Sequence, residues 1–145
     1  MFGDLIKRLM AGDAEDEVRV QDSREVIAAL LVRCARIDDD FDASEAAVIE
    51  RTLARRYGLG AAEARALCNR GAELEAEAGD TQHLTRVIKD AVPYDERIGV
   101  VEALWRVVLA DDHRDQHENA FLRLTSSLLG VSDRDSGLAR QRVTG

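Results

Sequence analysis

Carboxylates are the side chains of this sequence whose type and spacing could do chemistry. The stretch IDDDFDASE, residues 37–45, places four aspartates within five positions and adds a glutamate: Asp38, Asp39, Asp40, Asp42 and Glu45. Several carboxylates on one short turn resemble the oxygen shell that calcium or magnesium takes in proteins. Their like charges repel one another unless a cation or the start of a helix offsets them. The stretch therefore predicts either a cation site or an acid-rich helix start.

The acidic pattern occurs twice. Residues 110–122, ADDHRDQHENAFL, align with residues 37–49, IDDDFDASEAAVI, at a constant offset of 73. The acidic matches pair Asp38 with Asp111, Asp39 with Asp112, Asp42 with Asp115, and Glu45 with Glu118. Each copy follows an apolar segment, precedes an amphipathic one and closes at a glycine, Gly58 or Gly130. Because neighbouring repeats usually share one core, the sequence predicts two related helix–acidic turn–helix units joined by residues 61–92.

Helix capping explains part of the pattern. Asp42 and Asp115 stand where an N-cap belongs, and Glu45 and Glu118 follow three residues later, as in a capping box. Acids in a first helical turn also suit the helix dipole, by roughly 0.3–1 kcal/mol each. Capping accounts for two residues in each copy and leaves the aspartates before them without a role.

Metal binding is the second explanation, with candidate ligands at Asp38, Asp40, Asp42, Glu45, Asp111, Asp115 and Glu118. Asp38, Asp40 and Asp42 have the i, i+2, i+4 spacing of the first ligands in an EF-hand loop. However, Ala43 stands where that loop has glycine, and Glu45 comes at position 8 instead of 12. The pattern thus predicts a different loop, or one site assembled from both turns. Calcium and magnesium suit the carboxylates, while His113 and His117 would also suit zinc unless both are simply exposed.

The elements around these turns are predicted to be helices. Apolar residues recur at helical spacing, one proline and 4% aromatics favour helix over sheet, and no strand signal appears. The fold class is therefore all-α, a compact bundle of about seven helices. The helix expected to begin with Pro93 in its first turn, which contains Leu104 and Trp105, is the most apolar segment and is expected to lie at the centre.

Three parts of the chain are distinguished. Residues 1–21 are predicted to form a short amphipathic helix over 2–10 and then a polar linker over 11–21. The helix is expected to dock on the domain or to touch a membrane surface or a partner. Residues 22–133 form the helical domain, whose first helix would be capped by Asp22 or Ser23. Residues 134–145 are a tail, in which a turn of helix is expected to fray.

Composition excludes several classes of protein. The length of 145 residues, with 46% hydrophobic and 33% charged residues, suits one globular domain. A net charge of −8 and an isoelectric point near 4.9 argue against nucleic-acid binding. No apolar run approaches 18 residues, so no transmembrane segment is predicted, and the charged start does not resemble a secretory signal.

Catalytic patterns are also missing. Cys34 and Cys68 belong to no CxxC motif and are expected to be buried in a reducing environment, so we expect a cytoplasmic protein. The sequence has no pair of Glu-x-x-His motifs and no glycine-rich phosphate loop. We expect no enzymatic activity.

The segment ERIGVVEALWRVVLADDHRDQHE, residues 96–118, resembles the TerB-like family named for bacterial tellurite-resistance proteins. The family pattern Ala-Asp-Gly-x-x-Asp-x-x-Glu occurs twice, with a Leu-Trp-x-Val helix before the second copy, which matches Leu104, Trp105 and Val107. The motif residues matched here are Asp38, Asp42 and Glu45, then Ala110, Asp111, Asp115 and Glu118. The departures are Asp39 and Asp112 in place of glycine, Ile37 in place of alanine, and His113 and Arg114 in the second loop.

The resemblance covers residues from about 24 to 133. It implies a compact cytoplasmic seven-helix domain, acidic residues suggested to bind metal, and an association with tellurite and other chemical stress. Two functions stay open: a module that binds a divalent cation, or a metal-independent module whose acidic turns face a basic protein partner or a membrane-associated complex. Acidic turns that converge at one place would favour the cation.

Overall fold

The computed structural model describes residues 16–38, 41–110 and 116–144, with side chains for 23–37, 41–110 and 119–144. These residues contain helices and no strand, which confirms the predicted all-α fold. The predicted helix over residues 2–10 lies outside the described part. The elements are α2 (Asp16–Ala35), the 3₁₀ helix η1 (Arg36–Asp38), α3 (Ala43–Tyr57), α4 (Ala61–Glu77), α5 (Thr81–Ala91), α6 (Tyr94–Ala110), α7 (Gln116–Leu128) and α8 (Asp133–Thr144).

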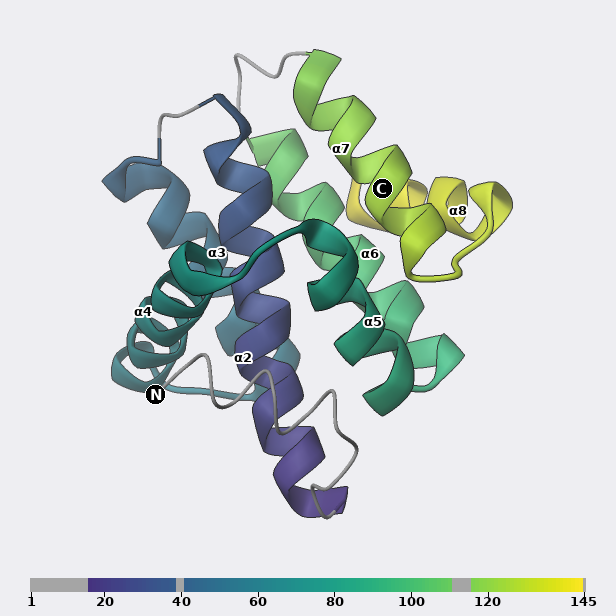
Figure 1. The fold of residues 1–145 in the computed structure, drawn as a ribbon. Coiled ribbons are helices and arrows are strands. Elements are labelled where there is room, and N and C mark those ends of the chain that lie inside the picture. Colours follow the sequence, from purple (N-terminus) through teal and green to yellow (C-terminus); the bar gives the residue numbers. More distant parts are fainter. Residues whose placement is uncertain (1–15, 39–40, 111–115, 145) are drawn as a thin grey trace.

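Helix α2 is the centre of the bundle. Figure 1 shows it running through the middle, and it contacts α3, α4, α5, α6 and α7. Residues 26–32 are all at most 1% exposed, although they cover every face of the helix. A helix that is apolar all round has to be buried on all sides. The expectation that the helix with Leu104 and Trp105 is central is therefore wrong: α6 keeps Trp105 and Arg106 half-buried, whereas α2 is enclosed.

Helices α2 and α4 approach each other closely at one glycine. A Cβ atom built on Gly71 of α4 would lie 2.6 Å from the Cβ of Ala28 and 2.8 Å from its backbone carbon. The residues that face each other here are therefore glycine and alanine, because a larger side chain would overlap the neighbouring backbone. This contact fixes the spacing between the central helix and the α4 layer.

The N-terminal boundary of α2 differs from the prediction. The helix begins at Asp16, so residues 16–21, expected to be linker, are helical, and Asp22 and Ser23 lie inside the helix. The segment DEVRVQ contains neither glycine nor proline, and acids suit a first helical turn. Apolar residues do not recur clearly at helical spacing in this segment, so periodicity did not predict the helix, although the residue types allow one.

The C-terminal helix α8 is longer than the expected single turn. It extends over twelve residues and packs against α6, with Ala139 completely buried. The indole N–H of Trp105 donates a hydrogen bond to the backbone oxygen of Ser136 at 3.1 Å. An isolated helix of this length is marginal in water. Tertiary contacts with α6, which periodicity does not reveal, therefore stabilise α8.

The sequence repeat is also a structural repeat. Helices α3 and α7 begin one residue after the aligned aspartates Asp42 and Asp115, which preserves the offset of 73. The predicted glycine stops are confirmed, since Gly58 has φ 65° and Gly130 has φ 75°. Both angles lie in the left-handed region, where glycine is favoured because it lacks a Cβ atom.

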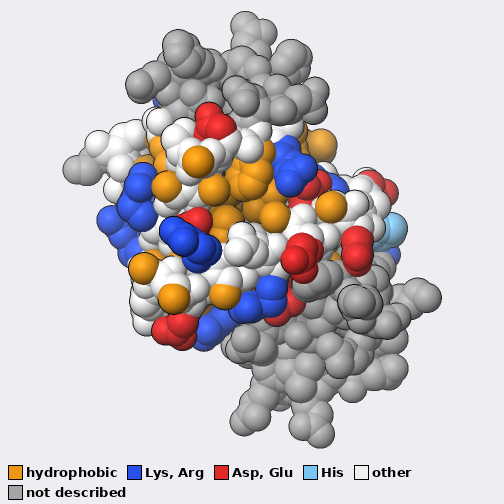
Figure 2. All heavy atoms as spheres, turned by 90° about the vertical axis from the view of Figure 1, so that its left-hand side faces the viewer, with side chains coloured by type: hydrophobic (Ala, Val, Ile, Leu, Met, Phe, Trp, Pro, Cys, Tyr) orange, Lys and Arg blue, Asp and Glu red, His pale blue; other side chains and the backbone are white. Residues whose placement is uncertain are grey.

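The surface on the α3 and α4 side carries mixed charges. Figure 2 shows this face, with basic and acidic side chains interspersed around an exposed apolar area. On this face the described charges do not gather into a stripe of one sign. None of the helices in residues 16–38, 41–110 and 116–144 is long and apolar enough to span a bilayer.

Candidate metal centre

The elements that border the two acidic stretches lie at the same end of the bundle. The first stretch follows η1 and precedes α3, and the second follows α6 and precedes α7. Helix α7 packs against η1 at the upper end of the view in Figure 1, and α3 packs against α6. Packing thus brings together four elements from the two halves of the chain.

Asp42 is the N-cap of α3, as the spacing predicts. Its Oδ1 atom accepts the backbone N–H of Glu45 at 2.9 Å and the hydroxyl of Ser44 at 2.7 Å. The Glu45 carboxylate accepts the Asp42 backbone N–H at 3.5 Å, which completes the capping box. Both bonds to Asp42 go to one carboxylate oxygen of an exposed side chain. The capping role confirmed here therefore uses Oδ1.

The same hydrogen bonds keep Asp42 ionised. The Ser44 hydroxyl, followed by the Glu45 backbone N–H, lowers the pKa of Asp42 below its ordinary value of 3.8. Donors that bond to a carboxylate favour its charged form. Asp42 is consequently an anion throughout the neutral range, which a role as a cation ligand requires.

The capping bonds predict a pH-dependent effect of Asp42→Asn. Because the folded pKa is lowered, the charged carboxylate stabilises the protein above pH 3.8, and this contribution is lost as pH falls through the folded pKa. We expect the variant to melt a few degrees below wild type at pH 7, and this gap to close in acid. Thermal melts followed by circular dichroism at pH 7 and at pH 3 would measure it. A gap that stays constant between these pH values would contradict the assignment.

The other predicted ligands are only partly visible. Asp38 ends η1 and Glu118 lies in α7, but neither side chain is described. The predicted ligands Asp40, Asp111 and Asp115 lie outside the described residues, as do Asp39, Asp112 and His113. Among the residues that are described, no three His, Cys, Asp or Glu side chains form a group able to hold a metal.

The two cysteines are buried, as predicted. Cys34 is 1% and Cys68 3% exposed. Burial, with a smaller contribution from the Glu50 carboxylate, raises the pKa of the Cys68 thiol to about 11. Since the thiolate is the reactive form of cysteine, Cys68 remains a protonated core residue at neutral pH.

Sequence reasoning passed over three arginines that the structure brings together. Arg51 and Arg55 of α3 line the same hollow as Arg106 of α6. Their spacing of four residues places Arg51 and Arg55 on one face of α3. The sequence could have shown that Arg51 and Arg55 share a face. It could not have shown that this face lies beside Arg106, because nothing in the sequence pairs the two.

Comparison with known proteins connects the fold to one family. A profile described as tellurite resistance protein TerB matches residues 24–141, which is most of the chain and includes η1, both acidic stretches and most of α8. Searches of curated proteins and of solved structures gave no significant match. The family match, which extends over the all-helical repeat described above, agrees with the resemblance carried by the duplicated acidic motif. The chain belongs to the family of tellurite resistance protein TerB.

Proposed function

We propose that this chain is a non-enzymatic TerB-family module that binds a divalent cation at the end of the bundle bordered by both acidic stretches. The observation that supports the proposal is the packing of α7 against η1. It brings η1, which ends at Asp38, against α7, which begins directly after Asp115, although the two elements lie in different halves of the chain. Two acidic stretches that served only as helix caps would need no such proximity.

The donor chemistry favours a hard cation. The ligands would come from Asp38, Asp40 and Asp42 of the first stretch and from Asp111 and Asp115 of the second. Carboxylate oxygens suit calcium and magnesium better than they suit soft metals. Asp42 retains one carboxylate oxygen beyond its capping bonds. A bound cation would also offset the repulsion among these carboxylates in a chain of net charge −8.

Calorimetric titration of the full chain with calcium, magnesium, manganese and zinc tests the proposal. We expect binding of calcium or magnesium, with a stabilisation of about 2.7 kcal/mol when the free metal is about a hundredfold above Kd. The double variant Asp38→Asn, Asp111→Asn should lose the binding heat and the rise in melting temperature. The variant Asp90→Asn removes an exposed carboxylate on α5 and should titrate like wild type.

Other outcomes are equally decisive. The absence of both heat and a melting shift at millimolar metal would refute the cation site. Flat titrations together with a protein partner that is lost in Asp38→Asn, Asp42→Asn would instead identify an interaction module. A role in tellurite or other chemical stress is part of our proposal. Wild type and the Asp38→Asn, Asp111→Asn variant should then differ in the growth that they support in tellurite.

A further inference from the structure

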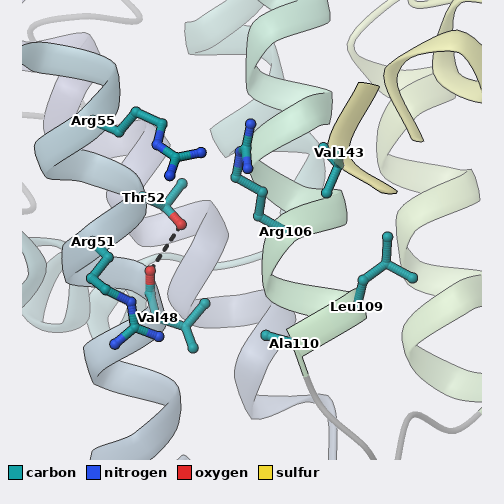
Figure 3. A pocket seen from close by; sticks show the side chains of 8 residues that line it. All are labelled: Val48, Arg51, Thr52, Arg55, Arg106, Leu109, Ala110 and Val143. Carbon is teal, nitrogen blue, oxygen red and sulfur yellow. Dashed lines mark hydrogen bonds between the residues drawn. The ribbon is translucent and has the colours of Figure 1, made fainter. Parts of the chain in front are cut away.

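A hollow of about 310 Å³ lies between α3, α6 and α8. Its lining includes three arginines, Arg51, Arg55 and Arg106, and three apolar side chains, Val48, Leu109 and Val143 (Figure 3). The volume falls at the lower end of the range for small-molecule sites. The lining combines an apolar wall with several positive charges, as a site for an amphiphilic ligand does.

Helical spacing explains why these side chains meet. Val48, Arg51 and Arg55 lie on successive turns of one face of α3. Figure 3 shows the guanidinium groups of Arg55, from α3, and Arg106, from α6, projecting into the space between the two helices. The Thr52 hydroxyl, which also lines the hollow, donates to the backbone oxygen of Val48 at 2.8 Å. Thr52 therefore satisfies its polar group within α3, and the arginines supply the charge.

Among the described side chains, no acid neutralises the three arginines. In the described part of the chain, no carboxylate oxygen lies within 4.0 Å of their side-chain nitrogens. The nearby acid Glu50 pairs with Arg65 at 3.7 Å. Arginines elsewhere do pair, as Arg70 does with Glu25 at 2.9 Å. A chain with a net charge of −8 thus concentrates three positive charges around one hollow, and none of the three pairs with a carboxylate among the side chains that the structure describes.

We propose that this hollow binds a small organic anion, a carboxylate or phosphate monoester that carries a short apolar body. The planar guanidinium groups of Arg55 and Arg106 match the oxygens of such an anion in bidentate geometry. The apolar body lies against Val48, Leu109 and Val143. Binding of the anion also relieves the repulsion among the three guanidinium groups.

Titration of the full chain with hexyl phosphate, hexanoate and inorganic phosphate, followed by NMR, tests the site. We expect hexyl phosphate to bind about tenfold more tightly than inorganic phosphate, because burying two methylenes suffices for that difference. The variant Arg55→Ala, Arg106→Ala should weaken hexyl phosphate binding by about tenfold or more. The variant Arg86→Ala, Arg123→Ala removes two exposed arginines on α5 and α7 and should bind like wild type.

A second variant separates guanidinium geometry from charge. Arg55→Lys, Arg106→Lys keeps both charges, and we expect its affinity to lie between those of wild type and the double alanine variant, because an ammonium group lacks the planar fork. Failure of both hexyl phosphate and hexanoate to bind at millimolar concentration would overturn the proposal. Equal weakening by the Arg86→Ala, Arg123→Ala control would overturn it as well. Equal affinity for inorganic and hexyl phosphate would rule out the apolar part of the site.

Discussion

Replacing Gly71 with valine is expected to lower the free energy of unfolding by about 3 kcal/mol. A Cβ at this position would lie 2.6 Å from the Cβ of Ala28 and 2.9 Å from the backbone nitrogen of Ala29. Two of the three nearest atoms belong to the backbone of α2, so no side-chain rotation relieves the overlap. The α4 helix would have to move away from the centre of the core. Urea unfolding followed by circular dichroism would measure the loss.

Gly137 provides the matched control, because it too lies inside a helix. A Cβ at Gly137 of α8 would meet no atom within 4 Å. Gly137→Ala is therefore expected to stabilise the protein by about 0.5–1 kcal/mol through helix propensity and a less flexible unfolded chain. If Gly71→Val and Gly137→Ala shifted the unfolding midpoint alike, close packing between α2 and α4 would not explain the glycine.

Replacing Arg33 with alanine is expected to cost about 2 kcal/mol. Its guanidinium bonds the Glu75 carboxylate at 3.2 Å and the backbone oxygens of Glu75 and Ala78, both at 3.3 Å. A further bond reaches the Thr81 hydroxyl at 3.4 Å. One side chain of α2 thus holds the end of α4 and the start of α5. The side chains of Arg33 and Glu75 are only 14% and 13% exposed, so water replaces the lost bonds poorly.

An exposed ion pair provides the comparison for Arg33. Arg142 bonds Glu102 at 3.0 Å, but the two side chains are 50% and 27% exposed. Exposed pairs contribute about 0–1 kcal/mol, so Arg142→Ala should change stability little. Equal losses in the free energy of unfolding for Arg33→Ala and Arg142→Ala would show that burial does not strengthen the Arg33 contacts. Urea unfolding of both variants in one buffer would distinguish the two cases.

Much of the fold follows from local patterns in the sequence. The acidic N-cap at Asp42 and the glycine stops at Gly58 and Gly130 are short-range features, and the structure confirms them. The central position of α2 was not predicted, because the run around Leu104 is the most apolar of the sequence and was therefore expected to lie at the centre. Only packing shows that α2 is enclosed by five helices.

The candidate sites show the same difference between features set by local sequence and features set by packing. Spacing alone predicted that Asp42 and Glu45 form a capping box, since both partners lie within four residues. The shared end of the bundle depends on contact between η1 and α7, which lie far apart in sequence. The arginine hollow depends on how α3 faces α6 and α8. Both sets of contacts join residues far apart in sequence, and neither the repeat nor the residue spacing predicts them.

The docking of α8 on Trp105 gives the protein a built-in optical reporter. Trp105 is the single tryptophan of the chain, its indole N–H bonds Ser136, and the Arg140 guanidinium lies 5.1 Å from the ring centre. All intrinsic tryptophan fluorescence therefore originates at the boundary between α6 and α8. Emission then reports whether this last helix is seated, while the far-ultraviolet signal reports the bundle as a whole. The two signals together distinguish release of one helix from loss of the entire core.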